Sequence, residues 1–210
     1  MPLQIDHNQR RAQLAQAVWR IVVREGVRGA SVRGVAREAG LSMGSVRHFF
    51  ATQDELLRFA VQEVVEQATR RIEAGAEART SAVDEGRPLD AATALLQEVL
   101  PLDEERLTEA RVWAAFTAPP VTDPVMAAVR READDGVREL CHDTLAGLAS
   151  LGLLDPARDL AVETERVHAL LDGLTLHLLH DPTRTPADRV RSVLLAHLGD
   201  LGRPPNTDAH

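Results

Sequence analysis

Apolar residues recur every three or four positions along nearly the whole chain, and no stretch reads as a convincing strand. This spacing matches the 3.6 residues per turn of an α-helix. Aromatic residues make up only 3% of the 210 residues and tyrosine is absent, whereas Ala, Leu and Arg abound. Aromatic and β-branched residues favour strands, while Ala, Leu, Arg and Glu favour helices. We therefore predict an all-α chain of about nine helices.

Capping residues set the expected helix boundaries. Ser31 and Ser42 are suitable N-caps, Gly26 and Gly40 are suitable ends, and Thr52 to Glu55 form a capping box. The pairs Asp123-Pro124, Asp155-Pro156 and Thr185-Pro186 precede three later helices, with the first residue of each as the expected N-cap. Residues 74–88 are predicted to be a frayed helix end and a loop. The expected helices cover about 8–24, 31–39, 43–49, 54–72, the region around 95–99, 107–116, 124–148, 156–180 and 186–201.

Charge is unevenly distributed along the chain. The whole chain carries a net charge of −8, which by itself argues against binding to nucleic acid. Residues 1–50, however, hold eight arginines against three acidic residues, a net charge of +5. The other 16 arginines face 29 acidic residues, a net charge of −13. A basic N-terminal part on an acidic body indicates either a polyanion-binding head or a solvated basic helix face.

The segment 31–49 has the pattern of a helix-turn-helix: a capped short helix, a glycine turn and a second capped short helix. In such a motif the first helix supports the second, whose N-terminal side chains enter the major groove of DNA. Val46, Phe49 and Phe50 are assigned to the core. We predict a DNA-binding domain over 1–53, a helical regulatory and dimerisation domain over 54–202, and a disordered tail over 203–210.

The residues of this segment resemble a known family. The run VRGVAREAGLSMGSVRHFFATQDELL, residues 32–57, is similar to the DNA-binding signature of the tetracycline-repressor (TetR) family, and the similarity covers about residues 10–58. From Arg111 to the final helix the chain also resembles the C-terminal domain of choline-sensing-type repressors. Arg47 stands where the family usually has Tyr, and Gln53 where it usually has Lys; both family residues contact phosphate.

The resemblance implies which residues contact DNA. Arg47 can replace the tyrosine or read guanine, and Gly44 would let the backbone approach the duplex. Arg10 and Arg11 would add electrostatic attachment. The full set of expected DNA-binding residues is Ser31, Arg33, Ser42, Met43, Gly44, Ser45, Arg47, His48 and Gln53.

The remainder of the chain is expected to regulate DNA binding. The resemblance implies a homodimer through the last two helices, a palindromic double-stranded operator, and a small-molecule effector that releases the protein from it. The scarce aromatics and several polar residues are candidates for lining the effector pocket, although each also fits an ordinary core or surface position. These candidates are Trp113, Phe116, Met126, Cys141, His168, Asp172 and His177.

Other classes of function remain as alternatives: an activator of the same fold, or a helical adaptor that does not bind DNA. We expect no enzyme, because the sequence has no nucleophile, phosphate-loop or metal-ligand signature. We expect no cofactor and no metal, since His168, Asp172 and His177 do not share one helix face. The single Cys141, the absence of a membrane-spanning run and the lack of a signal peptide predict a cytoplasmic protein without membrane contact.

Overall fold

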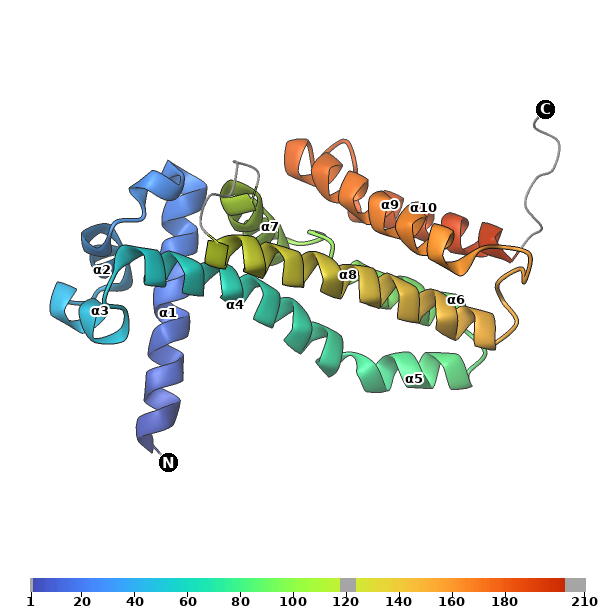
Figure 1. Cartoon of the computed structure of the whole chain (residues 1–210), viewed down its shortest axis with the longest axis horizontal. Coiled ribbons are helices and arrows are strands. Elements are labelled where there is room, and N and C mark those ends of the chain that lie inside the picture. The colour runs from blue at the N-terminus through green and yellow to red at the C-terminus, as the bar shows by residue number, and fades with distance from the viewer. Residues whose placement is uncertain (1, 118–123, 203–210) are drawn as a thin grey trace. The chain divides into compact units, whose positions relative to one another are not determined.

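The computed structural model describes residues 2–117 and 124–202, with side chains from residue 9 onward. These residues form helices and turns, and none of them lies in a strand, so the predicted all-α class is confirmed. Figure 1 shows the helices, which are α1 (Pro2–Glu25), the 3-10 turn η1 (Val27–Gly29), α2 (Val32–Ala39), α3 (Met43–Phe49), α4 (Gln53–Ala74), α5 (Ala76–Asp84), α6 (Pro88–Gln97), α7 (Glu104–Thr117), α8 (Pro124–Ser150), α9 (Leu160–His180) and α10 (Ala187–Leu201).

The predicted caps of the N-terminal helices are confirmed. Ser31 Oγ accepts a hydrogen bond from the Gly34 amide at 3.1 Å, and Ser42 Oγ accepts one from the Ser45 amide at 3.0 Å. Gly40 ends α2 in the left-handed conformation with φ of 68°, which a residue with a Cβ rarely adopts. These bonds satisfy amides that the first turn of a helix leaves without a partner.

The capping box at the start of α4 is also present. The Glu55 amide donates to Thr52 Oγ1 at 3.1 Å, and Glu55 Oε2 accepts in return from the Thr52 amide at 3.3 Å. The start of α4 is therefore fixed by residues that the sequence identifies.

Residues 74–88 differ from the prediction of a frayed end and a loop, because α5 occupies Ala76–Asp84. It is the helix beyond the nine expected, so the described residues hold ten α-helices. Gly75 separates α4 from α5, and the Arg79 guanidinium donates to the Ile72 carbonyl near the end of α4. Strong helix formers between two glycines, packed against α6, outweigh the loop signal of the glycines themselves.

Several other predicted helix starts need correction. α6 begins at Pro88 and α7 at Glu104, ahead of the predicted regions around 95–99 and 107–116. α9 begins at Leu160, not at 156, because Asp159 is its N-cap, while Asp155 caps a separate turn at the Ala157 amide. α10 begins at Ala187, with Pro186 itself in the N-cap position. α1 begins at Pro2, ahead of the predicted residue 8. The predicted cap Asp123 and the tail 203–210 lie outside the described residues.

The helices divide into two compact units. The first comprises the described residues up to Gln67 together with Thr108–Thr117 and Pro124–Arg130. It therefore includes the start of α4 and parts of α7 and α8 in addition to the predicted head. Its core contains fully buried side chains from four helices: Leu14, Val18, Trp19, Val35, Val46 and Leu56. Trp19 Nε1 donates to the Ala60 carbonyl at 2.7 Å, which attaches α1 to α4.

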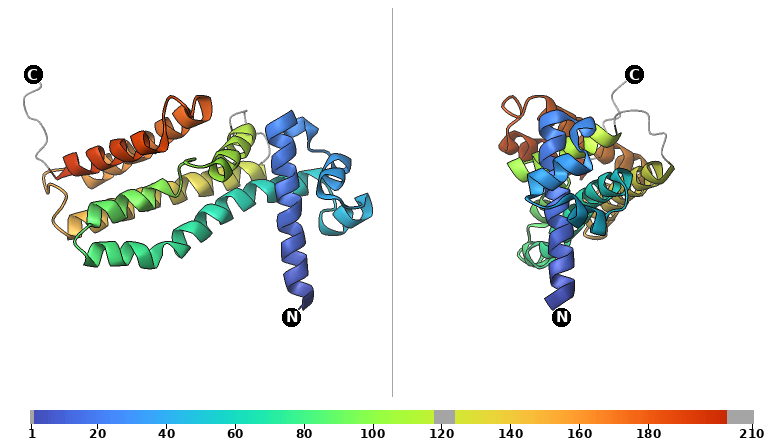
Figure 2. Two further views of the ribbon diagram at one scale, coloured as in Figure 1. Left: turned by 180° about the vertical axis from the view of Figure 1, so that it is seen from behind. Right: turned by 90° about the vertical axis from the view of Figure 1, so that its left-hand side faces the viewer.

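The second unit comprises Ala68–Leu107 and the described residues from Arg131 onward. Within it, α9 and α10 lie side by side, as Figure 2 shows from behind. Its core takes side chains from α6, α8, α9 and α10, including Leu96, Cys141, Leu145, Val167, Leu194 and Leu198. None of the helices in the described ranges is long and apolar enough to cross a membrane.

Candidate nucleic-acid interface

Helix α3 is held by one face and exposed on the other. Val46 is fully buried and Phe50, just after the helix, is 4% exposed, while Phe49 is half-buried against the same core. Arg47 and His48 lie between these anchors in the sequence and point to solvent. The predicted assignment of Val46 and Phe50 to the core is confirmed, and a helix fixed in this way can present its outer face without reorganising.

Most of the predicted DNA-binding residues are accessible. Ser45 is half-buried, and Met43 is half-buried with its side chain packed against the core of the first unit. Because of this packing, only part of the Met43 side chain is free to contact DNA. The other seven predicted residues are exposed or, at Gly44, have an exposed backbone: Ser31, Arg33, Ser42, Gly44, Arg47, His48 and Gln53.

Some of the basic charge of the head is already engaged within the protein. Glu38 accepts hydrogen bonds from Arg20 at 2.8 Å and from Arg24 at 3.1 Å, and these bonds lower the pKa of its carboxyl group. The Arg11 guanidinium lies 4.3 Å from the centre of the Phe59 ring and 5.0 Å from that of Phe50. Arg11 therefore makes cation–π contacts inside the head, in addition to any attachment to DNA.

The remaining basic charge of the head points outward. Four arginines are exposed and form no ion pair with any residue that the structure describes: Arg28, Arg33, Arg37 and Arg47. A guanidinium without an internal partner can bind phosphate bidentately. Arg28 and Arg37 belong to the predicted charge of the head but not to the contacts that the resemblance implies. No local signal shows that Glu38 pairs with Arg20 and Arg24 and leaves these two arginines unpaired.

Two helix N-termini add to this surface. Ser31 caps α2, and Arg33 lies in the first turn of that helix; Gln53 is the first residue of α4. Helix N-termini present backbone N–H groups and the positive end of the dipole, which suits phosphate. The head thus combines a supported short helix, unpaired arginines and two anion-compatible helix ends.

The predicted effector-pocket residues fall into both units. Trp113, Phe116 and Met126 pack together in the first unit with Val61 and Val129. In the second unit, Cys141 and His168 are buried, whereas Asp172 and His177 are exposed. His168 Nε2 lies 3.7 Å from Asp134 Oδ1. The structure therefore brings together three of the seven residues around one apolar cluster.

The chemistry of Cys141 is that of a core residue. Burial raises the pKa of its thiol to about 12, and the negative charges of Asp172 and Glu165 act in the same direction. A thiol with this pKa stays protonated near neutral pH, and it is the thiolate that reacts. In the described ranges, no three His, Cys, Asp or Glu side chains are placed to hold a metal ion.

Comparison with known sequences gives consistent matches. Residues 88–203 match the model of the C-terminal domain of BetI-type transcriptional repressors. The HTH-type transcriptional regulator PksA of Bacillus subtilis is 41% identical over 207 residues, which cover 96% of this chain and 94% of PksA. The regulator BetI of Stenotrophomonas maltophilia is 30% identical over 168 residues, 80% of each chain.

Solved structures share the fold. A transcriptional regulator from Rhodococcus sp. superposes with a TM-score of 0.72 at 30% identity, covering 93% of this chain and 99% of that one. A regulator from Saccharomonospora viridis, solved in complex with choline, has a TM-score of 0.74 at 22% identity and covers 89% and 94% of the two chains. The second likeness concerns the fold alone.

The supported helix, its exposed basic face and these relatives define a helix-turn-helix transcriptional regulator. Within that class, the chain belongs to the TetR family and carries a BetI-type C-terminal domain. Members of this family are transcriptional regulators and not enzymes. The alternative of a helical adaptor that does not bind DNA is set aside for the same reason, because the relatives are helix-turn-helix regulators.

Proposed function

We propose that the protein is a homodimeric repressor that binds a palindromic operator and is released from it by a small-molecule effector. The observation that carries the proposal is the geometry of α3, which is anchored by Val46 and Phe50 and directs Arg47 and His48 outward. A helix that is anchored on one face and exposes Arg47 and His48 on the other is what the major groove accommodates. The cytoplasm is the compartment in which such a protein meets DNA.

The proposed contacts divide into two kinds. Arg47 and His48, with the N-terminal residues Ser42 to Ser45, would face base edges, although Met43 contributes less because it packs on the core. Ser31, Arg33 and Gln53 would hold phosphates at the N-termini of α2 and α4. Phosphate contacts fix the register of the protein, and base contacts select the sequence.

An exposed apolar row on α9 supports the proposed dimer. Val162, Ala169 and Leu176 are spaced seven residues apart and are all exposed, with exposed fractions of 54% for Val162 and 53% for Leu176. Residues at this spacing lie on one face of a helix. Large apolar side chains in such a row support dimerisation through α9 and its neighbour α10.

We propose that the effector acts by shifting a two-state equilibrium. A ligand that binds better to a conformer with mismatched recognition helices lowers DNA affinity by linkage, and DNA weakens the ligand by the same factor. Residues of α4 belong to both compact units, up to Gln67 in the first and from Ala68 in the second, so α4 is a covalent link between the unit with the head and the second unit. The cluster of Trp113, Phe116 and Met126 is retained as a candidate for effector contact.

Titration with a palindromic duplex at two salt concentrations tests the proposal. We expect saturable binding that weakens steeply with salt, because arginines displace counterions from phosphates. Arg47→Ala should weaken binding to the palindrome by about tenfold, the effect of one charged contact. Arg131→Ala, which removes an exposed arginine of the second unit, is the matched control and should bind normally. Absence of binding at low salt would refute the proposal.

A further inference from the structure

The second unit contains a cavity of about 480 Å³ between α5, α6 and α10. Its wall is formed partly by apolar side chains, among them Ala78, Ala82, Ala91 and Leu195, and partly by charged ones. Cavities of this size are typical of sites for small organic molecules. None of the residues that the sequence analysis assigned to an effector pocket lines this cavity.

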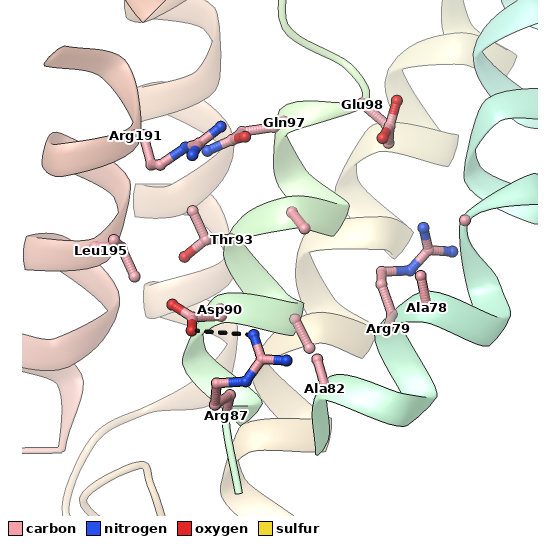
Figure 3. Close-up of a pocket in the computed structure, with 13 residues that line it drawn as sticks. Ala78, Arg79, Ala82, Arg87, Asp90, Thr93, Gln97, Glu98, Arg191 and Leu195 are labelled. Carbon is pink, nitrogen blue, oxygen red and sulfur yellow. Dashed lines mark ion pairs between the residues drawn. The ribbon is translucent and has the colours of Figure 1, made fainter. Parts of the chain in front are cut away.

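Two hydrogen-bond donors meet at one end of the cavity. Gln97 on α6 is only 9% exposed, and its Nε2 is buried without a hydrogen-bond partner among the residues that the structure describes. Arg191 on α10 is exposed, and its guanidinium forms no ion pair within the described part of the chain. Figure 3 shows the ends of these two side chains turned toward one another. A buried donor without an acceptor costs free energy, so this arrangement is unfavourable unless an acceptor is supplied.

The two carboxylates of the wall are already paired with arginines, and the Arg79 guanidinium donates to the Ile72 carbonyl. Asp90 lies 3.8 Å from Arg87, as the dashed line in Figure 3 marks, and Glu98 interacts with Arg71 at 3.8 Å and Arg106 at 3.4 Å. The carboxylates are thus neutralised by neighbouring arginines, and Arg191 is left without a carboxylate partner at the end of the cavity that Gln97 lines. In a segment with a net charge of −13 over residues 51–210, this cationic end is a local exception.

We propose that this cavity is a binding site for a small organic carboxylate. One carboxylate oxygen would accept from the Arg191 guanidinium and the other from Gln97 Nε2, which satisfies the buried donor. Arginine and a carboxylate match in geometry as well as in charge. The alanines and Leu195 would contact a short apolar body. A quaternary ammonium ligand lacks the acceptor that these two donors require.

NMR titration of the isotope-labelled full chain, without DNA, tests the site with hexanoate as the probe. Hexylamine and hexan-1-ol have the same body with a cationic or neutral head and serve as ligand controls. We expect hexanoate to shift the Gln97 side-chain amide signal, which is assigned by its loss in Gln97→Leu, and the two controls to leave it in place. Since no DNA is present, this outcome is separate from that of the operator titration.

Variants decide whether the two donors form the site. Arg191→Gln should weaken hexanoate binding by about tenfold or more, the usual effect of losing a charge-assisted hydrogen bond. Arg189→Gln removes an exposed arginine of the same helix that does not line the cavity, and it should bind as the parent does. Equal binding of hexylamine, or unchanged binding by Arg191→Gln, would overturn the proposal. So would a silent Gln97 signal, which would mean that the amide is turned to accept from Arg191.

Discussion

Gly44, in the first turn of α3, has no steric reason within the protein to lack a side chain. A Cβ at this position would meet only Ser42 Oγ, at 3.8 Å, which is ordinary van der Waals contact. By contrast, a Cβ at Gly29 would lie 2.7 Å from the Glu25 Cβ. Gly29 is therefore required by packing inside the head, whereas Gly44 is consistent with the proposed close approach of DNA.

Gly44→Ala should separate stability from DNA binding. We expect the free energy of unfolding to rise by up to about 1 kcal/mol, because alanine favours the helix. Affinity for the operator should fall by about tenfold, because the added methyl group occupies space that the duplex needs. Urea unfolding and fluorescence anisotropy with a labelled duplex measure the two effects. Unchanged affinity would show that the backbone at Gly44 does not approach DNA.

His197 on α10 is the group from which we predict that the second unit loses stability in acid. Burial lowers the pKa of its imidazole below 6.5, and the positive charge of Arg166 acts in the same direction. Arg158 also lowers this pKa more weakly, while the nearby carboxylates Glu163 and Asp200 oppose the shift. Its Nε2 is buried and lacks a hydrogen-bond partner in the described structure. The folded chain therefore binds a proton at this position less readily than the unfolded chain does.

Stability should consequently fall as the pH drops below about 6.5 toward the lower pKa of the folded state, and the contribution of His197 is fully present above that range. His197→Gln should reduce this loss, which thermal unfolding between pH 7.5 and 5 would measure. His177→Gln, at an exposed histidine of α9, is the control and should keep the parent's pH profile. An unaltered profile in His197→Gln would contradict the assignment.

At the scale of the helix, Ser42 has a structural role as well as a proposed DNA contact. Its Oγ caps α3 at the Ser45 amide. Ser42→Ala should lower the free energy of unfolding by about 1 kcal/mol, since caps contribute that much. Ser42→Asn should restore stability, because asparagine also caps. Urea unfolding and operator titration distinguish the two roles. If the asparagine variant is as stable as the parent but binds the operator less tightly than the parent does, Ser42 contacts DNA directly.

The elements that sequence predicted well are those with local signals. Ser31, Gly40, Ser42 and the Thr52–Glu55 box fixed α2, α3 and the start of α4 because each bond spans only three or four residues. The start of α9 was wrong because two aspartates compete within 155–159, and the backbone amide of Asp155 is bound by the distant Leu201 carbonyl. Long-range bonds of this kind have no local signature.

At the scale of the whole molecule, the proposed dimer depends on the exposed row on α9. Leu176→Arg should convert the dimer to a monomer, because it places a charge in an apolar interface. Leu151→Arg is a matched control, since Leu151 is 52% exposed but lies just after α8. Sedimentation velocity distinguishes the species. A dimer that persists in Leu176→Arg would place the interface on another surface.

In the candidate site too, features within one helix were predicted from the sequence, whereas contacts between residues far apart in the chain were not. The buried Val46 was predicted from the capped pattern of one short helix, and Arg47 and His48 were predicted from the resemblance of that helix to the TetR-family signature. The engagement of Arg11 with two phenylalanine rings and of Glu38 with two arginines was not, because the partners are far apart in the chain. Charge counts therefore identified the head, while only the fold shows which arginines remain unpaired.

The Arg79 side chain connects the end of α4 with the cavity described above. It donates to the Ile72 carbonyl near the end of α4, and it also lines the cavity between α5, α6 and α10. An occupant that drew Arg79 toward itself would leave that carbonyl without its donor and loosen the last turn of α4. Filling the cavity beside Gly75 would therefore also fray the end of α4, a helix whose residues belong to both compact units.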